Sequence, residues 1–215
     1  IFDLLLKHNL GAITFTILCI VFLTQAFNII DGLNGLSLTT GIICFLSISY
    51  ISIDLKDYDV HLISVIFLSI LLGVLIFNIF GKIFIGDSGA YIIGFFVAIT
   101  SINLIARNDN ISSFVIAYIL IYPSYELSRT ILFRIINKKN IFLPDKNHLH
   151  SLLNEINIHK FRLSTFRANI FSSVQIIFLQ TINFLLLIKF YSNTEILTVC
   201  IVFFILQYEI LYYFC

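Results

Sequence analysis

The sequence predicts an all-helical protein that crosses a membrane several times, and three observations lead to this fold class. Hydrophobic residues make up 59% of the 215 residues and charged residues only 12%, whereas soluble domains average about 25% charged residues. The mean hydropathy is +1.01. Stretches without any charge recur along the chain and are long enough to cross about 30 Å of hydrocarbon as helices. We therefore expect a polytopic membrane protein.

Seven charge-free stretches predict about seven transmembrane helices within one integral-membrane domain, 1–215. Strands are not expected, because an open sheet leaves backbone groups unpaired in lipid and these runs lack the polar alternation of a barrel. The stretches without Asp, Glu, Lys or Arg are 8–30, 32–53, 60–81, 88–106, 110–125, 168–188 and 196–208. The fifth is expected to kink at Pro123 and to continue beyond the membrane, and a short helix is expected after Pro144.

Basic residues are distributed unevenly between the two expected membrane faces. If the spans alternate in direction, nine of the thirteen lysines and arginines fall on one face, which the positive-inside rule makes cytoplasmic. They are Lys82, Arg129, Arg134, Lys138, Lys139, Lys146, Lys160, Arg162 and Arg167. The same face carries the polar loops at about 28–36, 78–89 and 126–167, so we expect the functional residues there. The net charge of +1 excludes a nucleic-acid binder that depends on bulk charge.

The first of these loops contains Asn28, Asp31 and Asn34 together with two glycines. An ionised carboxylate at Asp31 is costly near the membrane unless it meets a cation, and Gly32 lets a ligand approach the backbone closely. A tight Asp-Gly and Asn-Gly turn without any chemistry accounts for the same residues. The residues of this loop alone leave both interpretations open.

The second loop ends in Gly86-Asp87-Ser88-Gly89, directly before the fourth expected span. Asp87 or Ser88 could simply cap that helix. Alternatively, the helix N-terminus could bind a phosphate while Asp87 holds Mg²⁺, an ion that proteins bind through one or two carboxylates together with substrate phosphates. Lys82 adds a positive charge nearby.

The third segment reads Pro144-Asp145-Lys146-Asn147-His148-Leu149-His150 and follows a basic stretch. Two histidines could bind zinc, but no third and fourth ligand of the Cys or His type accompanies them. Asp145 could cap the following helix, and the basic residues could serve only to orient the protein. A basic loop with histidines also suits recognition of a diphosphate, whose oxygens Arg and Lys neutralise.

In this order the three segments resemble the motifs of the polyprenyl-phosphate N-acetylaminosugar-1-phosphate transferases, a family that includes the WecA and MraY types. The matching residues are Asn28-x-x-Asp31-Gly-Leu-Asn-Gly-Leu, Gly86-Asp87-Ser88-Gly89 and Pro144-Asp145-x-x-His148-Leu149-His150. The resemblance covers about residues 12–190. The spaced His-Leu-His resembles the WecA branch more than the triple-histidine run of the MraY branch.

The resemblance implies transfer of an N-acetylaminosugar 1-phosphate from a UDP-sugar to a polyprenyl phosphate, with release of UMP, at the cytoplasmic face of a bacterial plasma membrane. It implies Asp87 as the main Mg²⁺ ligand, with Mn²⁺ as an alternative ion, and Asp31 as a second ligand or as a carboxylate that orients the substrate. The resemblance also implies catalytic roles for Asp31, Asp87, His148 and His150. The two histidines would contact the nucleotide diphosphate. The residues expected to bind substrate are Asn28, Asn34, Asn78, Lys82, Arg129, Asp145 and Lys146. The expected partners are these two substrates and membrane lipids, no nucleic acid is expected, and a homodimer is left open.

The chain also departs from the family pattern. The family carries an adjacent Asp-Asp pair upstream of the first motif, and this chain has none. Because the chain opens at Ile1 without Met, we expect the pair and further spans upstream, and we expect the 215 residues alone to be inactive or nearly so. Asn34 stands where many relatives have Asp, and Ser151 stands where the WecA branch often has His.

Two other functions compete with a transferase. A transporter or channel subunit would place charges near the bilayer midplane, within broken helices. The acidic residues of this chain instead collect at the ends of the expected spans, which weighs against that function. An inactive fragment that only anchors partners is the other alternative, because the upstream aspartates are missing.

Overall fold

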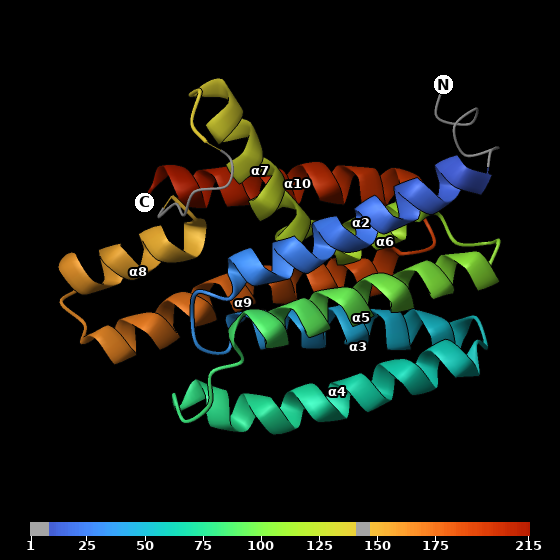
Figure 1. The fold of residues 1–215 in the computed structure, drawn as a ribbon, viewed down its shortest axis with the longest axis horizontal. Helices are drawn as coiled ribbons and strands as arrows, with labels where there is room; N and C mark the ends of the chain where they lie inside the picture. The colour runs from blue at the N-terminus through green and yellow to red at the C-terminus, as the bar shows by residue number, and fades with distance from the viewer. Residues whose placement is uncertain (1–8, 141–146) are drawn as a thin grey trace.

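The computed structural model describes residues 9–140 and 147–215, and in these ranges every regular element is a helix (Figure 1). Six of the helices are long and apolar enough to cross a membrane, so the expected all-helical, polytopic fold is confirmed. The elements are α2 (Asn9–Ile30), α3 (Leu36–Asp54), α4 (Tyr58–Ile79), α5 (Gly86–Arg107), α6 (Ser113–Ile119), α7 (Ile121–Ile136), α8 (Leu149–His159), α9 (Thr165–Phe190) and α10 (Thr194–Tyr213).

The expected fifth span, 110–125, is divided between two helices, so the described residues hold six long apolar helices where about seven were expected. Helix α6 ends at Ile119 and α7 begins at Ile121, with Leu120 between them at φ −94° and ψ 10°. Pro123 lies in the first turn of α7 and has no N–H with which to continue the hydrogen bonding of α6. Beyond this break, α7 continues to Ile136, and α8 is the short helix expected after Pro144.

Helix α3 lies at the centre of the bundle. In its most apolar window 72% of the residues are buried, against 17% for α4. Helix α3 contacts α4, α5 and α9, while α2 contacts α5 and α7. The α2–α5 contact is close, because a Cβ atom added at Gly94 would lie 2.8 Å from Thr24 Cα. Small residues at such contacts are typical of helices that pack in membranes.

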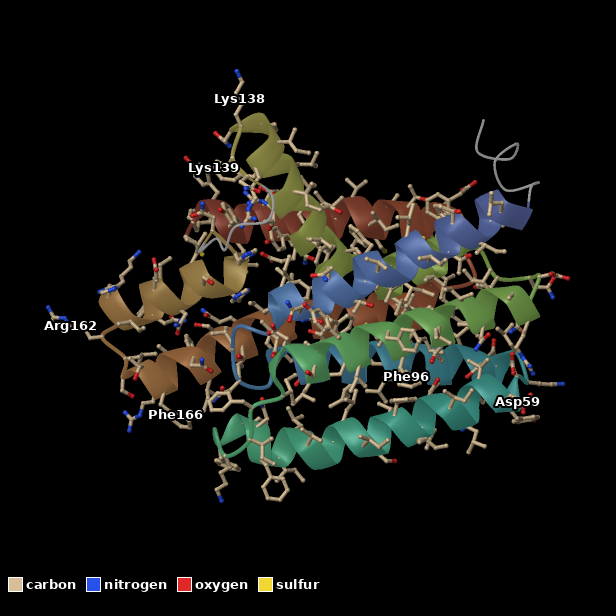
Figure 2. All side chains as sticks on the ribbon, in the orientation of Figure 1. Asp59, Phe96, Lys138, Lys139, Arg162 and Phe166 are labelled. Atoms are coloured by element: carbon tan, nitrogen blue, oxygen red, sulfur yellow. The ribbon has the colours of Figure 1, made fainter. Side chains whose placement is uncertain are left out.

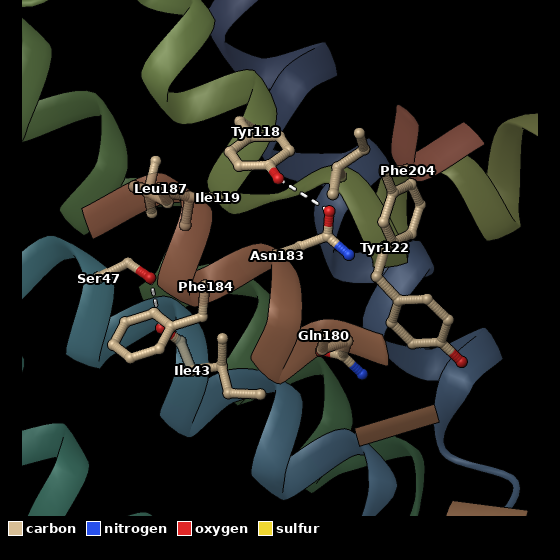
Figure 3. A pocket seen from close by; sticks show the side chains of 11 residues that line it. Ile43, Ser47, Tyr118, Ile119, Tyr122, Gln180, Asn183, Phe184, Leu187 and Phe204 are labelled. Carbon is tan, nitrogen blue, oxygen red and sulfur yellow. Dashed lines mark hydrogen bonds between the residues drawn. The ribbon is translucent and has the colours of Figure 1, made fainter. Parts of the chain in front are cut away.

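Polar side chains attach α9 to its neighbours inside the bundle. Asn183 accepts a hydrogen bond from Tyr118 Oη of α6 at 2.8 Å and donates one to Gln207 of α10 at 3.1 Å. Gln180 donates to Thr40 Oγ1 of α3 at 3.1 Å. Tyr118, Gln180 and Asn183 also line a small cavity of about 20 Å³ (Figure 3). Because lipid offers no competing hydrogen bonds, these contacts help to fix the position of α9 in the bundle.

The links between helices gather at two opposite ends of the bundle (Figure 1). One end holds the links α2–α3, α4–α5 and α8–α9, and the other holds α3–α4, α5–α6 and α9–α10. Figure 2 shows Arg162 at the first end and Asp59 at the second. The turn that contains Asp31 and the first turn of α5, which contains Asp87, therefore lie at the same end as the histidine segment.

Candidate active site

Asp31 lies in the turn between α2 and α3, where its side chain is partly buried. Its backbone N–H donates to the carbonyl of Asn28 at 3.3 Å. The turn ends at Gly35, whose φ of +79° lies in the left-handed region that favours glycine. Burial, together with the nearby carboxylate of Asp87, raises the pKa of Asp31 to about 7. The acidic residues of the first and second segments therefore interact electrostatically.

Asp87 is exposed in the first turn of α5. This helix begins at Gly86, Ile85 occupies the N-cap position, and no side chain caps it. The alternative in which Asp87 or Ser88 caps the helix is therefore wrong, because the helix begins before either residue. A carboxylate in the first turn is still favoured by the partial positive charge of the helix end.

Asn78 connects the first two segments. The residue is 5% exposed, its Oδ1 accepts a hydrogen bond from Gly35 N at 2.6 Å, and its Nδ2 donates to Ile83 O at 2.8 Å. One amide at the end of α4 thus holds the α2–α3 turn and the α4–α5 link together. The prediction that Asn78 binds substrate is not tested by these contacts.

Asn34 attaches the first segment to α9. Its N–H donates to Asn169 Oδ1 at 2.9 Å, and its carbonyl accepts a hydrogen bond from Ser173 Oγ at 2.9 Å. Its side-chain nitrogen lies 3.6 Å from the position of a Cβ atom added at Gly81, so the two loops also touch here. Lys82 follows in the same link and is exposed.

The two histidines of the third segment lie against the first segment. The rings of His148 and His150 are parallel within 4°, with centroids 5.4 Å apart. His150 is 4% exposed, and a Cβ atom added at Gly32 would lie 2.2 Å from its Nε2 atom. Burial lowers the pKa of His150 to about 4, so this ring is neutral near pH 7. The predicted residues Asp145 and Lys146 lie outside the described residues.

Glu126 is a site residue that the sequence analysis missed. It is 1% exposed, its Oε1 accepts a hydrogen bond from Leu149 N at 3.2 Å and lies 3.2 Å from His148 Nδ1, and its Oε2 accepts one from Tyr208 Oη. Helix α8 begins at Leu149, so this carboxylate lies at its positive end. Glu126 directly follows the charge-free stretch 110–125, and this carboxylate at the end of an expected span was the available signal, because such residues in membrane proteins are costly and usually functional.

Arg129 is attached to α10. Its Nε donates to Glu209 Oε1 at 2.8 Å, and its guanidinium carbon lies 3.4 Å from the centre of the Tyr212 ring. Tyr125 Oη donates to the same Glu209 oxygen at 2.8 Å. Glu209 therefore offsets part of the positive charge of Arg129, and binding of substrate by Arg129 stays a prediction.

The neighbouring carboxylates of Asp31 and Asp87 suit a divalent cation that also binds a phosphate. Among the residues that the structure describes, no group of three or more His, Cys, Asp and Glu side chains is placed to hold a metal ion. Mg²⁺ is usually bound through only one or two carboxylates, with substrate phosphates and water completing its ligands.

These features define an integral membrane protein with a polar site at one end of its helix bundle, built from acidic, amide and histidine side chains. Residues 2–105 match the sequence profile of glycosyl transferase family 4. The chain belongs to this family, which agrees with the resemblance of its three motifs.

Curated relatives of two kinds match the chain. It is 32% identical over 151 residues to a probable undecaprenyl-phosphate N-acetylglucosaminyl 1-phosphate transferase of Bacillus subtilis, and this match covers 68% of the chain and 42% of the relative. It is 31% identical over 167 residues to decaprenyl-phosphate N-acetylglucosaminephosphotransferase of Mycobacterium tuberculosis, over 68% of the chain and 41% of the relative. It is 38% identical over 93 residues to phospho-N-acetylmuramoyl-pentapeptide-transferase of Streptococcus uberis, over 43% of the chain and 28% of the relative. The chain thus spans less than half the length of these relatives, and no solved structure matches it.

Proposed function

We propose that the protein containing this chain transfers an N-acetylaminosugar 1-phosphate from a UDP-sugar to a polyprenyl phosphate and releases UMP. The observation that carries this proposal is the meeting of three distant polar segments at one end of a membrane bundle. Asn78 joins the first two, and His150 of the third lies against Gly32 of the first. Membership of the family and the names of the relatives, which act on polyprenyl phosphates, support it.

The reaction requires positioning and charge neutralisation more than covalent chemistry from the protein. A phosphate oxygen of the lipid attacks the β-phosphorus of the UDP-sugar, and the bond from that phosphorus to the bridging oxygen breaks, so that UMP leaves. We assign Asp31 and Asp87 to a bound Mg²⁺ or Mn²⁺, which would neutralise charge on the diphosphate. His148 and His150 supply ring N–H groups or lone pairs beside the same turn, and Lys82 adds positive charge.

We further propose that this end of the bundle faces the cytoplasm, with the lipid substrate entering from the bilayer. The support is the distribution of charge in Figure 2, where Lys138, Lys139 and Arg162 lie toward the end that holds the site and Asp59 lies at the other. Positive residues favour the cytoplasmic side of membrane proteins. A polyprenyl chain in the membrane and a soluble nucleotide sugar could both reach a site placed there.

The proposed function is tested by UMP release from UDP-N-acetylglucosamine, and from other UDP-N-acetylaminosugars, in membranes that contain undecaprenyl phosphate and the protein as its gene encodes it. Asp87→Asn keeps the size of the side chain but removes the charge that a cation requires. We expect its rate to fall at least about 100-fold, the scale on which loss of one preorganised electrostatic group acts.

The matched control is Asp109→Asn, an exposed carboxylate in the α5–α6 link at the opposite end of the bundle. Its rate should equal that of the unchanged protein. A parental rate in folded Asp87→Asn would refute the assignment of Asp87. Absence of UMP release with every UDP-N-acetylaminosugar would refute the proposed reaction.

A further inference from the structure

The Nδ1 atom of His148 faces two oxygen atoms of α7. Glu126 Oε1 lies 3.2 Å away, and Thr130 Oγ1 lies 3.3 Å away. Glu126 and His148 are 1% and 8% exposed, so water has little access to the contact. The hydrogen bonds that a histidine ring makes decide which of its two nitrogens carries the proton. For His148, the atoms next to Nδ1 therefore decide the position of the proton.

Both neighbours of Nδ1 are hydrogen-bond acceptors. The hydroxyl of Thr130 donates its own proton to the backbone carbonyl of Glu126 at 2.8 Å, so toward His148 it can only accept. The carboxylate of Glu126 receives the N–H of Leu149 on one oxygen and the hydroxyl of Tyr208 on the other. A buried carboxylate with donors on both oxygens is satisfied in its ionised form, in which it has no proton to give.

We propose that Glu126 is a positioning residue that, together with Thr130, keeps the ring proton of His148 on Nδ1 and thereby leaves Nε2 for the substrate. The two nitrogens lie on different edges of the ring, so Nε2 is directed away from the oxygens of α7. While the ring is neutral, Nε2 is an acceptor, and after protonation it donates an N–H to a phosphate oxygen. The inference rests on the proposed function only in naming a diphosphate as the group that Nε2 meets.

Helix α10 takes part in this arrangement through Tyr208. Its side chain is fully buried, and its hydroxyl holds the Glu126 oxygen that does not face His148. Rotation of the carboxylate would break this hydrogen bond as well as the one from Leu149 N. The carboxylate is thus fixed from α8 and α10 at once, as expected of outer partners that orient a functional histidine.

The proton position is measured by ¹⁵N nuclear magnetic resonance of the protein as its gene encodes it, labelled at histidine and held at pH 8. The signal of His148 is identified by its loss in His148→Gln. We expect Nδ1 to carry the proton in the unchanged protein and in Glu126→Gln, whose amide oxygen still accepts. Glu126→Leu, which has no acceptor, should transfer a measurable fraction of the proton to Nε2. Tyr118→Phe removes a buried hydroxyl that donates to Asn183 and not to Glu126 or His148, so it should leave the His148 signals unchanged.

Steady-state kinetics supply a second measurement. Loss of the outer partners of metal-ligating histidines typically lowers activity by about 10–100-fold. By analogy we expect a fall of this size in kcat/KM for Glu126→Leu, with Glu126→Gln recovering part of it. A purely structural role would instead lower the amount of folded protein at unchanged kcat/KM, which would overturn the proposal.

If Glu126→Leu does not fold, the spectrum of the unchanged protein still decides. A proton found on Nε2 of His148 would refute the inference, even if UMP release is normal. A proton found on Nδ1 supports it, even if the substrate proves to be a different one.

Discussion

The backbone of Gly32 lies against the imidazole of His150, so closely that a Cβ atom added at Gly32 would stand 2.2 Å from Nε2. The two residues belong to the first and third polar segments, and their contact places the histidines beside Asp31. Glycine is required here because any side chain would occupy the volume of the ring. The contact explains a glycine of the first motif by packing between distant parts of the chain.

The first prediction concerns this contact. Gly32→Ala should displace the ring of His150 and lower the rate of UMP release, because a real Cβ atom cannot lie 2.2 Å from a nitrogen. The matched control is Gly73→Ala in α4, where, apart from its chain neighbours and the nearby backbone of α4, no atom lies within 4 Å of the added Cβ. That change should leave the rate unaltered and leave the stability equal or higher, since Ala favours a helix by roughly 0.5–1 kcal/mol over Gly. Equal rates for both variants would show that the position of His150 does not matter.

The second prediction concerns Asn78. Asn78→Leu leaves Gly35 N and Ile83 O without their side-chain partners, and an unsatisfied buried group costs about 1–3 kcal/mol. The unfolding temperature in detergent should therefore fall, and the rate of transfer should fall with it. Asn78→Asp keeps the acceptor for Gly35 N and should lose less activity than Asn78→Leu. If Asn78→Leu melts like the unchanged protein, the two loops are held together by other contacts.

The third prediction concerns pH and Mg²⁺. Burial and the charge of Asp87 raise the pKa of Asp31 from 3.8 to about 7, so the folded state retains this proton to higher pH than the unfolded chain. The stability that this proton confers is complete below pH 3.8 and is lost as the pH rises to about 7. The unfolding temperature of metal-free protein should fall over this range, and it should fall less in Asp31→Asn.

A cation bound between the two carboxylates would reverse that loss. Addition of Mg²⁺ should therefore raise the unfolding temperature more at pH 8 than at pH 5, since binding to the folded state stabilises it. Asp31→Asn and Asp87→Asn should each reduce this rise. A rise of the same size in both variants would mean that Mg²⁺ binds elsewhere.

The fourth prediction concerns orientation. Lys160 and Asp109 are exposed and lie at opposite ends of the bundle. In intact cells, a membrane-impermeant thiol reagent should label Asp109→Cys and should label Lys160→Cys only after the membrane is opened. The unchanged protein, with its own four cysteines, provides the background. Labelling of Lys160→Cys alone in intact cells would reverse the proposed topology.

The helices could be predicted from the sequence because charge-free length is what a bilayer requires. The exception is 110–125, where Pro123 removes a backbone donor and the chain divides into α6 and α7. A proline does not by itself tell whether a span bends slightly or breaks. The outcome depends on packing with other helices, and α7 contacts both α2 and α10.

The candidate site was only partly predictable. Asp31, Asp87 and the histidines stand out because polar residues in short motifs interrupt apolar runs. Glu126, Tyr208 and Asn169 belong to no short motif and act through partners far away in the chain, so no spacing reveals them. Asn78 was assigned by proximity to a motif, whereas its hydrogen bonds to two loops appear only in three dimensions.

The candidate site is attached to α9 and α10, and this attachment has a consequence for how the protein is made. Chains are synthesised from the N-terminus, and early segments enter the membrane before later ones exist. Asn34 is held by Asn169 and Ser173 of α9, and Glu126 by Tyr208 of α10. The turn that carries Asp31 therefore gains its contacts with α9 only after α9 has been translated, and Glu126 gains its contact with Tyr208 only after most of α10 has been translated. The contacts that hold the candidate site together are thus complete only when synthesis of α10 is almost finished.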